Sequence, residues 1–165
     1  MIHGLRLVSE KQLRVRKITQ GTVIDHIPGG KALTVLKLLG ISAQTGECIT
    51  IAMNIPSSKI GKKDIIKIEN MFLSGQDFNK IALIAPRATI NKIQDTRIVQ
   101  KEPVSIPDNF SGIIRCINPT CITNKENEPI SSKFQVLQRK PLTIKCGYCD
   151  RVMDESESMV NLIFR

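Results

Sequence analysis

Apolar residues recur with two different periods along the first two thirds of the chain, and these periods predict strands and helices. Alternation predicts five strands, over residues 13–27, 48–53, 63–69, 88–93 and 97–101. Spacings of three and four residues predict two helices, over residues 32–39 and 78–84. We expect a bend in the first strand near Gly21, and helix ends at Gly40 and Pro86. Ser74 and Asp77 form a capping-box pattern ahead of the second helix.

These elements follow the order β-α-β-β-α-β with one extra strand. That order favours a ferredoxin-like split βαβ sheet in which both helices pack on one face. Residues 1–12 show no firm periodicity, and we interpret them as a loose arm. The pattern therefore predicts an α+β fold class, with a first domain over residues 1–103.

The pattern changes at residues 101–109, KEPVSIPDN, which contain two prolines and indicate a linker. Helical periodicity is absent beyond this point, so we predict a small all-β second domain over residues 108–165. Its strands are expected at residues 110–115, 133–137, 142–145 and 159–164. A unit this short, with few bulky side chains, is marginal on its apolar core alone and often needs a metal or a disulfide.

Four of the five cysteines lie in this second unit. They form a C-x4-C pair, Cys116 and Cys121, and a C-x2-C pair, Cys146 and Cys149. Two such knuckles supply the four thiolates of a tetrahedral zinc site, so we predict one structural Zn²⁺ per chain. Two disulfides are the alternative, which a reducing compartment disfavours. The remaining cysteine, Cys48, is predicted to be a buried core thiol.

Composition narrows the function classes. The chain has 165 residues, 41% of them hydrophobic, and Lys+Arg 24 against Asp+Glu 15 gives a net charge of +9. This hydrophobic content argues against disorder, and no apolar run approaches the roughly 20 residues of a membrane span. The N-terminus lacks the apolar core of a signal peptide, so a cytoplasmic protein without a membrane partner is expected. The basic excess suggests a nucleic-acid partner or a solvated basic surface.

No catalytic constellation is recognisable in the sequence. Neither His3 nor His26 has a Ser or Cys partner at a readable spacing, and the chain has no Gly-rich phosphate loop or H-E-x-x-H motif. A site of four cysteines is also closed to water and substrate, which argues against a zinc enzyme. We therefore predict a protein that is not an enzyme.

Polar residues gather on one face of the predicted first sheet. Three residues of one strand share a parity and project from one face: Lys63, Ile65 and Lys67. Asn91 and Lys101 lie on strands that could be its neighbours, and Asp25 adds a carboxylate. Lysines beside an amide and a carboxylate could hold an anionic nucleotide, with the lysines on its phosphates. The alternative is the solvated polar face of a one-sided sheet.

Several segments together resemble the regulatory chain of aspartate carbamoyltransferase. They are GTVIDHIP at 21–28, GKKDIIKIEN at 61–70, APRATIN at 85–91, CINPTC at 116–121 and KCGYC at 145–149. The resemblance runs in order from Val15 onward over nearly the whole chain. The sequence departs from the bacterial pattern at Arg16, where that pattern has an acidic residue, and at Thr96, where it has an aromatic one. The N-terminal arm is also longer.

The resemblance implies a non-catalytic subunit of pyrimidine biosynthesis whose first domain binds the effectors CTP and ATP. It implies a zinc domain that docks on the catalytic chain, and regulatory homodimers within a dodecamer of two catalytic trimers and three regulatory dimers. The nucleotide-binding residues implied by position are Val15, Lys17, Ile18, Asp25, His26, Lys63, Ile65, Lys67, Asn91, Ile98 and Lys101. The zinc ligands are Cys116, Cys121, Cys146 and Cys149.

Two expectations remain beside these. Asn118 and Asp150 flank the knuckles and are candidates for contacts to the catalytic chain, with ordinary turn chemistry as the alternative. The competing function is a zinc-ribbon protein that binds nucleic acid, which the net charge of +9 and the cysteines support. It is weakened by an aromatic content of only 4% and by the lack of a contiguous basic cluster.

Overall fold

The computed structural model describes residues 16–154, which form two antiparallel sheets and two short α-helices. The elements of the first part are β1 (Gly21–Pro28), α1 (Ala32–Leu38), η1 (Ala43–Thr45), β2 (Ile49–Ser57), β3 (Gly61–Glu69), α2 (Gly75–Ile84), β4 (Thr89–Gln94) and β5 (Arg97–Pro103). Those of the second part are β6 (Asn109–Ser111), η2 (Ile122–Asn124), β7 (Lys133–Arg139), β8 (Leu142–Cys146) and β9 (Val152–Asp154). The predicted arm at 1–12, Val15 and the predicted strand at 159–164 lie outside the described residues.

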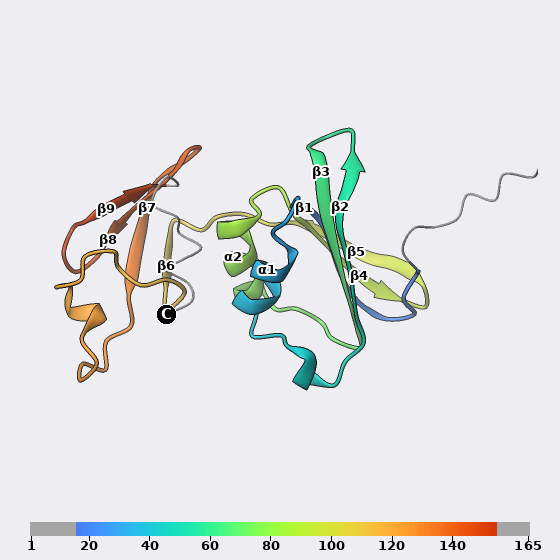
Figure 1. The fold of residues 1–165 in the computed structure, drawn as a ribbon, viewed down its shortest axis with the longest axis horizontal. Helices are drawn as coiled ribbons and strands as arrows, with labels where there is room; N and C mark the ends of the chain where they lie inside the picture. The colour runs from blue at the N-terminus through green and yellow to red at the C-terminus, as the bar shows by residue number, and fades with distance from the viewer. Residues whose placement is uncertain (1–15, 155–165) are drawn as a thin grey trace, which may run out of the picture.

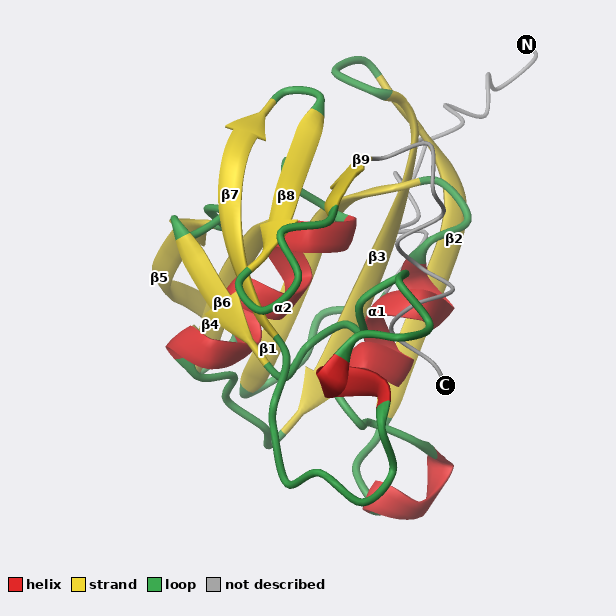
Figure 2. Cartoon of the chain, turned by 90° about the vertical axis from the view of Figure 1, so that its left-hand side faces the viewer, coloured by secondary structure: helices red, strands yellow, loops and turns green. Residues whose placement is uncertain are grey.

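The first sheet has the strand order β2-β3-β1-β4-β5, with every neighbouring pair antiparallel. Both helices cover the same face of it (Figure 1). In Figure 2, α1 lies over the β2–β3 side and α2 over the β1–β4 side. This arrangement confirms the α+β fold class and the split βαβ sheet, with β5 as the extra strand at the β4 edge.

The helix ends follow the predicted signals. At α2, the Asp77 Oδ2 atom accepts hydrogen bonds from the Ser74 backbone N–H at 2.9 Å and from its hydroxyl at 2.8 Å. At α1, Gly40 adopts φ +70°, and the N–H of Ile41 donates to the carbonyl of Leu36 at 3.0 Å. Such a C-terminal turn favours glycine because an L side chain strains a positive φ. Neither helix is long and apolar enough to cross a membrane.

The strand predicted over residues 13–27 is shorter in the structure. Among its described residues, only Gly21 and those after it belong to β1. Gly21 has φ +130°, and a Cβ atom there would lie 2.1 Å from the carbonyl oxygen of Ile68. The close approach of β3 therefore requires glycine at this position, and the backbone turns before it. Residues 16–20 belong to no strand; the carbonyls of Thr19 and Gln20 bond to Thr96, in the turn between β4 and β5, and to Asn70, just after β3.

The second sheet has the order β6-β7-β8-β9. Phe110 pairs with Phe134, and their ring centroids are 5.5 Å apart; Ile144 pairs with Met153, and all four side chains are buried. The strand predicted at 110–115 ends at Ser111, because Gly112 takes φ +67° and donates its N–H to the carbonyl of Ser132. β9 was not predicted.

The two helices lie between the two sheets, as Figure 1 shows. Residues predicted as linker contribute to both neighbouring parts: β5 continues to Pro103, and β6 begins at Asn109. Between them Val104 and Ile106 are buried, with exposures of 6% and 8%. They belong to one apolar core that also includes Ile81 of α2 and residues of the second sheet. The connection is therefore packed rather than free.

Candidate functional sites

The four cysteines predicted as metal ligands come together in the second sheet. Their Sγ atoms all lie within 4.8 Å of one another, with 3.6 Å between Cys116 and Cys149 and 3.9 Å between Cys121 and Cys146. A disulfide would require about 2.05 Å. A tetrahedron of thiolates at about 2.3 Å from a zinc ion has sulfur–sulfur edges of about 3.8 Å. The donor set therefore fits a four-thiolate metal site and not a pair of disulfides.

Backbone N–H groups of the two knuckles point at the sulfur atoms. Burial raises the pKa of the Cys116 and Cys146 thiols, and the N–H of Asn118, which faces Cys116, opposes that rise. The N–H of Arg151 lowers the pKa of Cys149 to about 7. Because these donors stabilise thiolate, the site is prepared for a cation. Four thiolates leave no open coordination position, so a metal here would be structural.

The fifth cysteine does not follow its prediction. Cys48 is exposed just before β2, and the carboxylate of Glu69 raises the pKa of its thiol. The alternation of residues 48–53 predicted a buried side chain, but β2 begins only at Ile49 and is an edge strand. Cys48 is therefore not a core residue.

Three predicted nucleotide ligands lie in one register row across the first sheet. Val23 of β1 pairs with Lys67 of β3 on one side and with Asn91 of β4 on the other. Asn91 in turn pairs with Lys101 of β5. Side chains in one row project to the same face of a sheet. Since the neighbouring Ile24 and Ile66 are fully buried in the core, this row lies on the open face, away from the helices.

Two polar side chains of this row are removed in part from water. Asn91 is 7% exposed, and its Oδ1 atom has no hydrogen-bond partner, while Nδ2 lies 3.5 Å from the carbonyl oxygen of Val23. Burial lowers the pKa of Lys67, whose Nζ atom donates to the carbonyl oxygen of Arg16. An unpaired acceptor and a partly desolvated ammonium are both stabilised by a ligand that carries hydroxyl or amino groups together with negative charge.

An ion pair lies at the end of this face. Lys63 Nζ contacts the two carboxylate oxygens of Asp25 at 2.8 and 3.1 Å. His26, with φ +61°, lies next to them; its buried Nδ1 atom is 3.5 Å from Asp25 Oδ2 and makes no hydrogen bond. The structure therefore groups three predicted ligands here and pairs two of them with each other.

The segment before β1 forms one border of the open face. The carbonyl of Thr19 accepts from the N–H of Thr96 at 2.9 Å, and that of Gln20 accepts from the N–H of Asn70 at 3.1 Å. Ile18 is 5% exposed, whereas Lys17 is exposed. Of the remaining predicted ligands, Ile65 is half-buried on β3 and Ile98 is 58% exposed in the row of Ile93.

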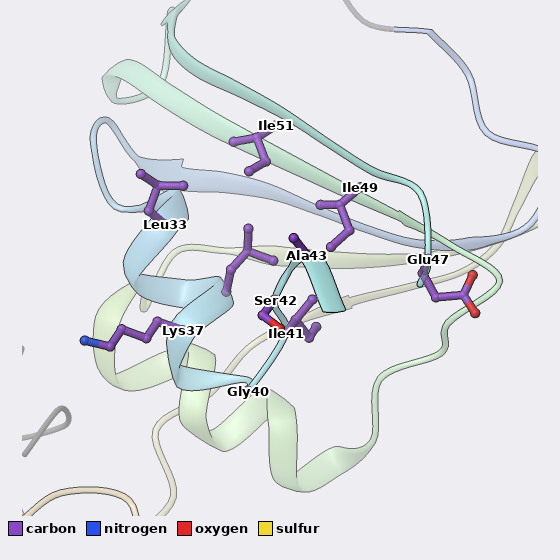
Figure 3. Close-up of a pocket in the computed structure, with 10 residues that line it drawn as sticks. Leu33, Lys37, Gly40, Ile41, Ser42, Ala43, Glu47, Ile49 and Ile51 are labelled. Carbon is purple, nitrogen blue, oxygen red and sulfur yellow. The ribbon is translucent and has the colours of Figure 1, made fainter. Parts of the chain in front are cut away.

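A cavity of about 700 Å³ lies between α1 and β2, on the helix side of the sheet. Figure 3 shows Leu33, Ile49 and Ile51 directed into it. Its lining consists of Leu33, Leu36, Lys37, Gly40, Ile41, Ser42, Ala43, Glu47, Ile49 and Ile51. No predicted nucleotide ligand among the described residues lines this cavity, and its wall is mainly apolar.

Asn118 and Asp150 line a second cavity, of about 460 Å³, beside the knuckles. Asn118 Oδ1 accepts hydrogen bonds from the N–H and the hydroxyl of Thr120, which is ordinary turn chemistry. Asp150 takes φ +55° and pairs with Lys145 at 3.1 Å. Both residues thus have local roles, and Asp150 also presents its side chain to solvent.

The sequence reasoning missed two residues beside the metal site. Thr123 and Asn124 are the second and third residues after Cys121, and they contact the first knuckle through their side chains. Their position next to a ligand is the signal that could have drawn attention to them. Nothing in their residue types alone predicts which atoms they contact.

Comparisons with known proteins give matches over both parts of the chain. Residues 13–105 match the family model for the aspartate carbamoyltransferase regulatory chain, allosteric domain, and residues 108–159 match the model for its metal binding domain. The regulatory chain of Pyrococcus abyssi is 50% identical over 92% of this chain and 99% of its own. That of Hyperthermus butylicus is 52% identical over 88% and 91%. These matches do not favour a nucleic-acid-binding zinc ribbon.

Proposed function

The chain belongs to the family of aspartate carbamoyltransferase regulatory chains, and on that premise we propose that it is the non-catalytic regulatory subunit of this enzyme. Residues 1–103 form the domain that binds the effectors CTP and ATP. Residues 108–165 form a domain that holds one structural zinc ion and docks on the catalytic chain. A cytoplasmic location is part of the proposal, because free thiols persist in reducing compartments.

The observation that carries the effector site is the single register row on the open face that contains Lys67 of β3, Asn91 of β4 and Lys101 of β5. Lysines on strands are held more precisely than lysines on loops, which suits the binding of a triphosphate. Lys67 and Lys101 lie on opposite sides of Asn91 and supply the ammonium groups. The unpaired Oδ1 of Asn91 would accept a hydrogen bond from a nucleoside hydroxyl or amino group.

The ion pair of Asp25 with Lys63 provides a second polar part of this site. A phosphate that approaches Lys63 competes with Asp25 for the ammonium group, which would release the carboxylate to a ribose hydroxyl. His26 lies beside both residues. The predicted ligands Lys17, Ile18, Ile65 and Ile98 would border the base and ribose, and Val15 completes the proposed set.

The surface around the two cysteine knuckles is suited to docking on the catalytic chain. Asn118 and Asp150 line the cavity there, and Val152 and Tyr148 are apolar side chains with exposures of 47% and 41%. Exposed apolar groups ringed by polar ones are typical of a protein–protein interface. We assign this surface to the catalytic chain.

The homodimer is assigned to the other end of the molecule. β2 is an edge strand whose unpaired backbone can join a second copy, and Ile51 and Met53 are exposed on it. The cavity between α1 and β2 offers apolar lining to the same neighbour (Figure 3). Three such dimers would bridge two catalytic trimers in the proposed dodecamer.

The packed connection supplies a route from effector to partner. Val104 and Ile106 join the core that contains α2 and the second sheet, so a shift of the first sheet must be accommodated by that core. An effector regulates only if it binds two global states with different affinities. We propose that nucleotide binding changes how the first domain packs on this connection, and that the zinc domain passes the change to the catalytic trimers.

Replacing Lys67 with Ala tests the effector site. Loss of one charge-assisted contact of about 1.5–3 kcal/mol should weaken CTP binding by at least about tenfold in calorimetry. Lys140→Ala, on an exposed lysine of the second part, is the matched control and should bind CTP as the wild type does. Both variants should retain full zinc content. CTP affinity that is unchanged in K67A would reject the assigned site.

A further inference from the structure

The turn that follows the first knuckle, η2 (Ile122–Asn124), holds that knuckle through two side chains. Asn124 Nδ2 donates to the carbonyl oxygens of Cys116 at 2.7 Å and Asn118 at 2.8 Å. Thr123 Oγ1 donates to Cys121 Sγ at 3.3 Å. We propose that Asn124 and Thr123 are positioning residues for the metal. Asn124 sets the spacing of the thiolates of Cys116 and Cys121, and Thr123 lowers the electron density on the sulfur of Cys121.

The choice of residue at position 124 follows from its partners. Both contacted atoms are carbonyl oxygens, so the side chain must present a donor to each, and a carboxamide nitrogen has two N–H groups to give. A carboxylate there would place negative charge against two carbonyl oxygens. The Oδ1 atom of Asn124 is buried and has no hydrogen-bond partner. The two hydrogen bonds donated by Nδ2 therefore offset the free-energy cost of one unpaired buried acceptor.

These bonds close the loop that carries Cys116 and Cys121. The carbonyl oxygen of Asn118, in the middle of the knuckle, also accepts a hydrogen bond from the N–H of Cys121, its last residue, at 3.0 Å. The bond from Asn124 to the carbonyl of Cys116 ties the first residue of the knuckle to the same group. In the folded domain these bonds hold the two sulfurs in position, so the loop must open before a bound ion can leave.

The contact at Thr123 acts on the sulfur itself. A hydroxyl that donates to a thiolate withdraws electron density from it and fixes its orientation. Thr123 and Asn124 thus act on the same knuckle through different atoms. This inference rests on the proposal that the four cysteines hold zinc, and extends it to residues that do not bind the ion.

Zinc release from the full chain to a chromogenic chelator tests the role of Asn124. Asn124→Asp retains the size of the side chain but removes its donors, and release should be about 10- to 100-fold faster, the effect typical of residues that orient metal ligands. Asn127→Asp is the matched control, because Asn127 is exposed in the same loop. It should release zinc at the wild-type rate. If N124D does not fold with metal, Asn124→Ser is measured in its place.

Cobalt substitution gives a readout that a general loss of stability would not produce. Thr123→Val should move the thiolate-to-cobalt charge-transfer band to lower energy, while Thr123→Ser, which keeps the hydroxyl, should restore the wild-type band. Identical bands in all three chains would overturn the role of Thr123. Wild-type release kinetics in N124D and N124S would overturn the role of Asn124. A wild-type chain that retains no zinc would instead contradict the proposed cofactor, and this inference with it.

Discussion

Asp64 of β3 is a fully buried polar residue that contacts both α1 and β2. Its Oδ2 atom accepts from the N–H of Ala32, the first residue of α1, at 2.9 Å. Its Oδ1 atom accepts from the N–H of Asn54 at 2.8 Å, where the pairing of β2 with β3 changes register. One side chain therefore satisfies a helix terminus and an irregular strand at the same time.

Asp64→Asn should be strongly destabilising despite its equal size. The amide keeps one acceptor oxygen and turns its NH₂ group toward a backbone N–H, so one donor is left buried without a partner. We expect a loss of about 1.5–3 kcal/mol in the free energy of unfolding, measured with urea on the full chain. Asp95→Asn, at an exposed turn with φ +48°, is the matched control and should be nearly neutral. Equal midpoints for the two variants would refute this account.

At the scale of single residues, the sequence shows which residues could bind a ligand better than it shows which groups they contact in the fold. The spacing of the cysteines alone predicts a four-thiolate cluster, because the two ligands of each pair lie close together in the sequence. The row of Lys67, Asn91 and Lys101 depends on strand pairing, which parity on one strand does not define. The role of Asn124 could not be predicted, since it depends on two backbone carbonyls whose positions appear only in the folded knuckle.

The elements differ in what stabilises them. The first sheet packs both helices onto fully buried isoleucines such as Ile24, Ile66 and Ile68. The second sheet has two strands of three residues each, β6 and β9, and few large buried side chains. Its stability should therefore depend on the metal, whose binding contributes on the order of 10 kcal/mol in small zinc domains.

Metal removal should unfold the two parts unequally. After treatment with a thiol mercurial and a chelator, amides of β6–β9 should exchange with deuterium at the rate of unfolded chain. Amides of β1, β3 and β4 should remain protected, as measured by hydrogen exchange with mass spectrometry on the full chain. Protection of β7 and β8 after complete metal loss would contradict the assigned structural role of the ion.

The predicted strand bounds were wrong where the backbone conformation, and not the periodicity of the side chains, determines where a strand begins or ends. The alternation of residues 13–27 continues through Gly21, but the φ of +130° and the approach of the Ile68 carbonyl end the strand there. β9 is too short for a pattern, since only Met153 of its three residues is buried. The helices were predictable because both periodicity and terminal signals, Ser74 with Asp77 and Gly40, agree with the packing.

At the scale of the molecule, the chain combines two surfaces with a packed connection. The open face of the first sheet carries the polar row, and the knuckle surface lies in the second sheet, with the helices between the two sheets (Figure 1). Two prolines predict a linker at 101–109, but they carry no information about packing, and the structure shows that Val104 and Ile106 are buried. Such a connection transmits strain instead of isolating the two parts.

The measurement that tests the central claim is reconstitution with the catalytic chain of the same organism. Size-exclusion chromatography with light scattering should show a complex larger than the catalytic trimer and containing both chains. In that complex, CTP or ATP should shift the aspartate concentration at half-maximal velocity, and the isolated trimer should not respond. A mixture that forms no complex, or a complex whose aspartate saturation is the same with and without both nucleotides, would contradict the account.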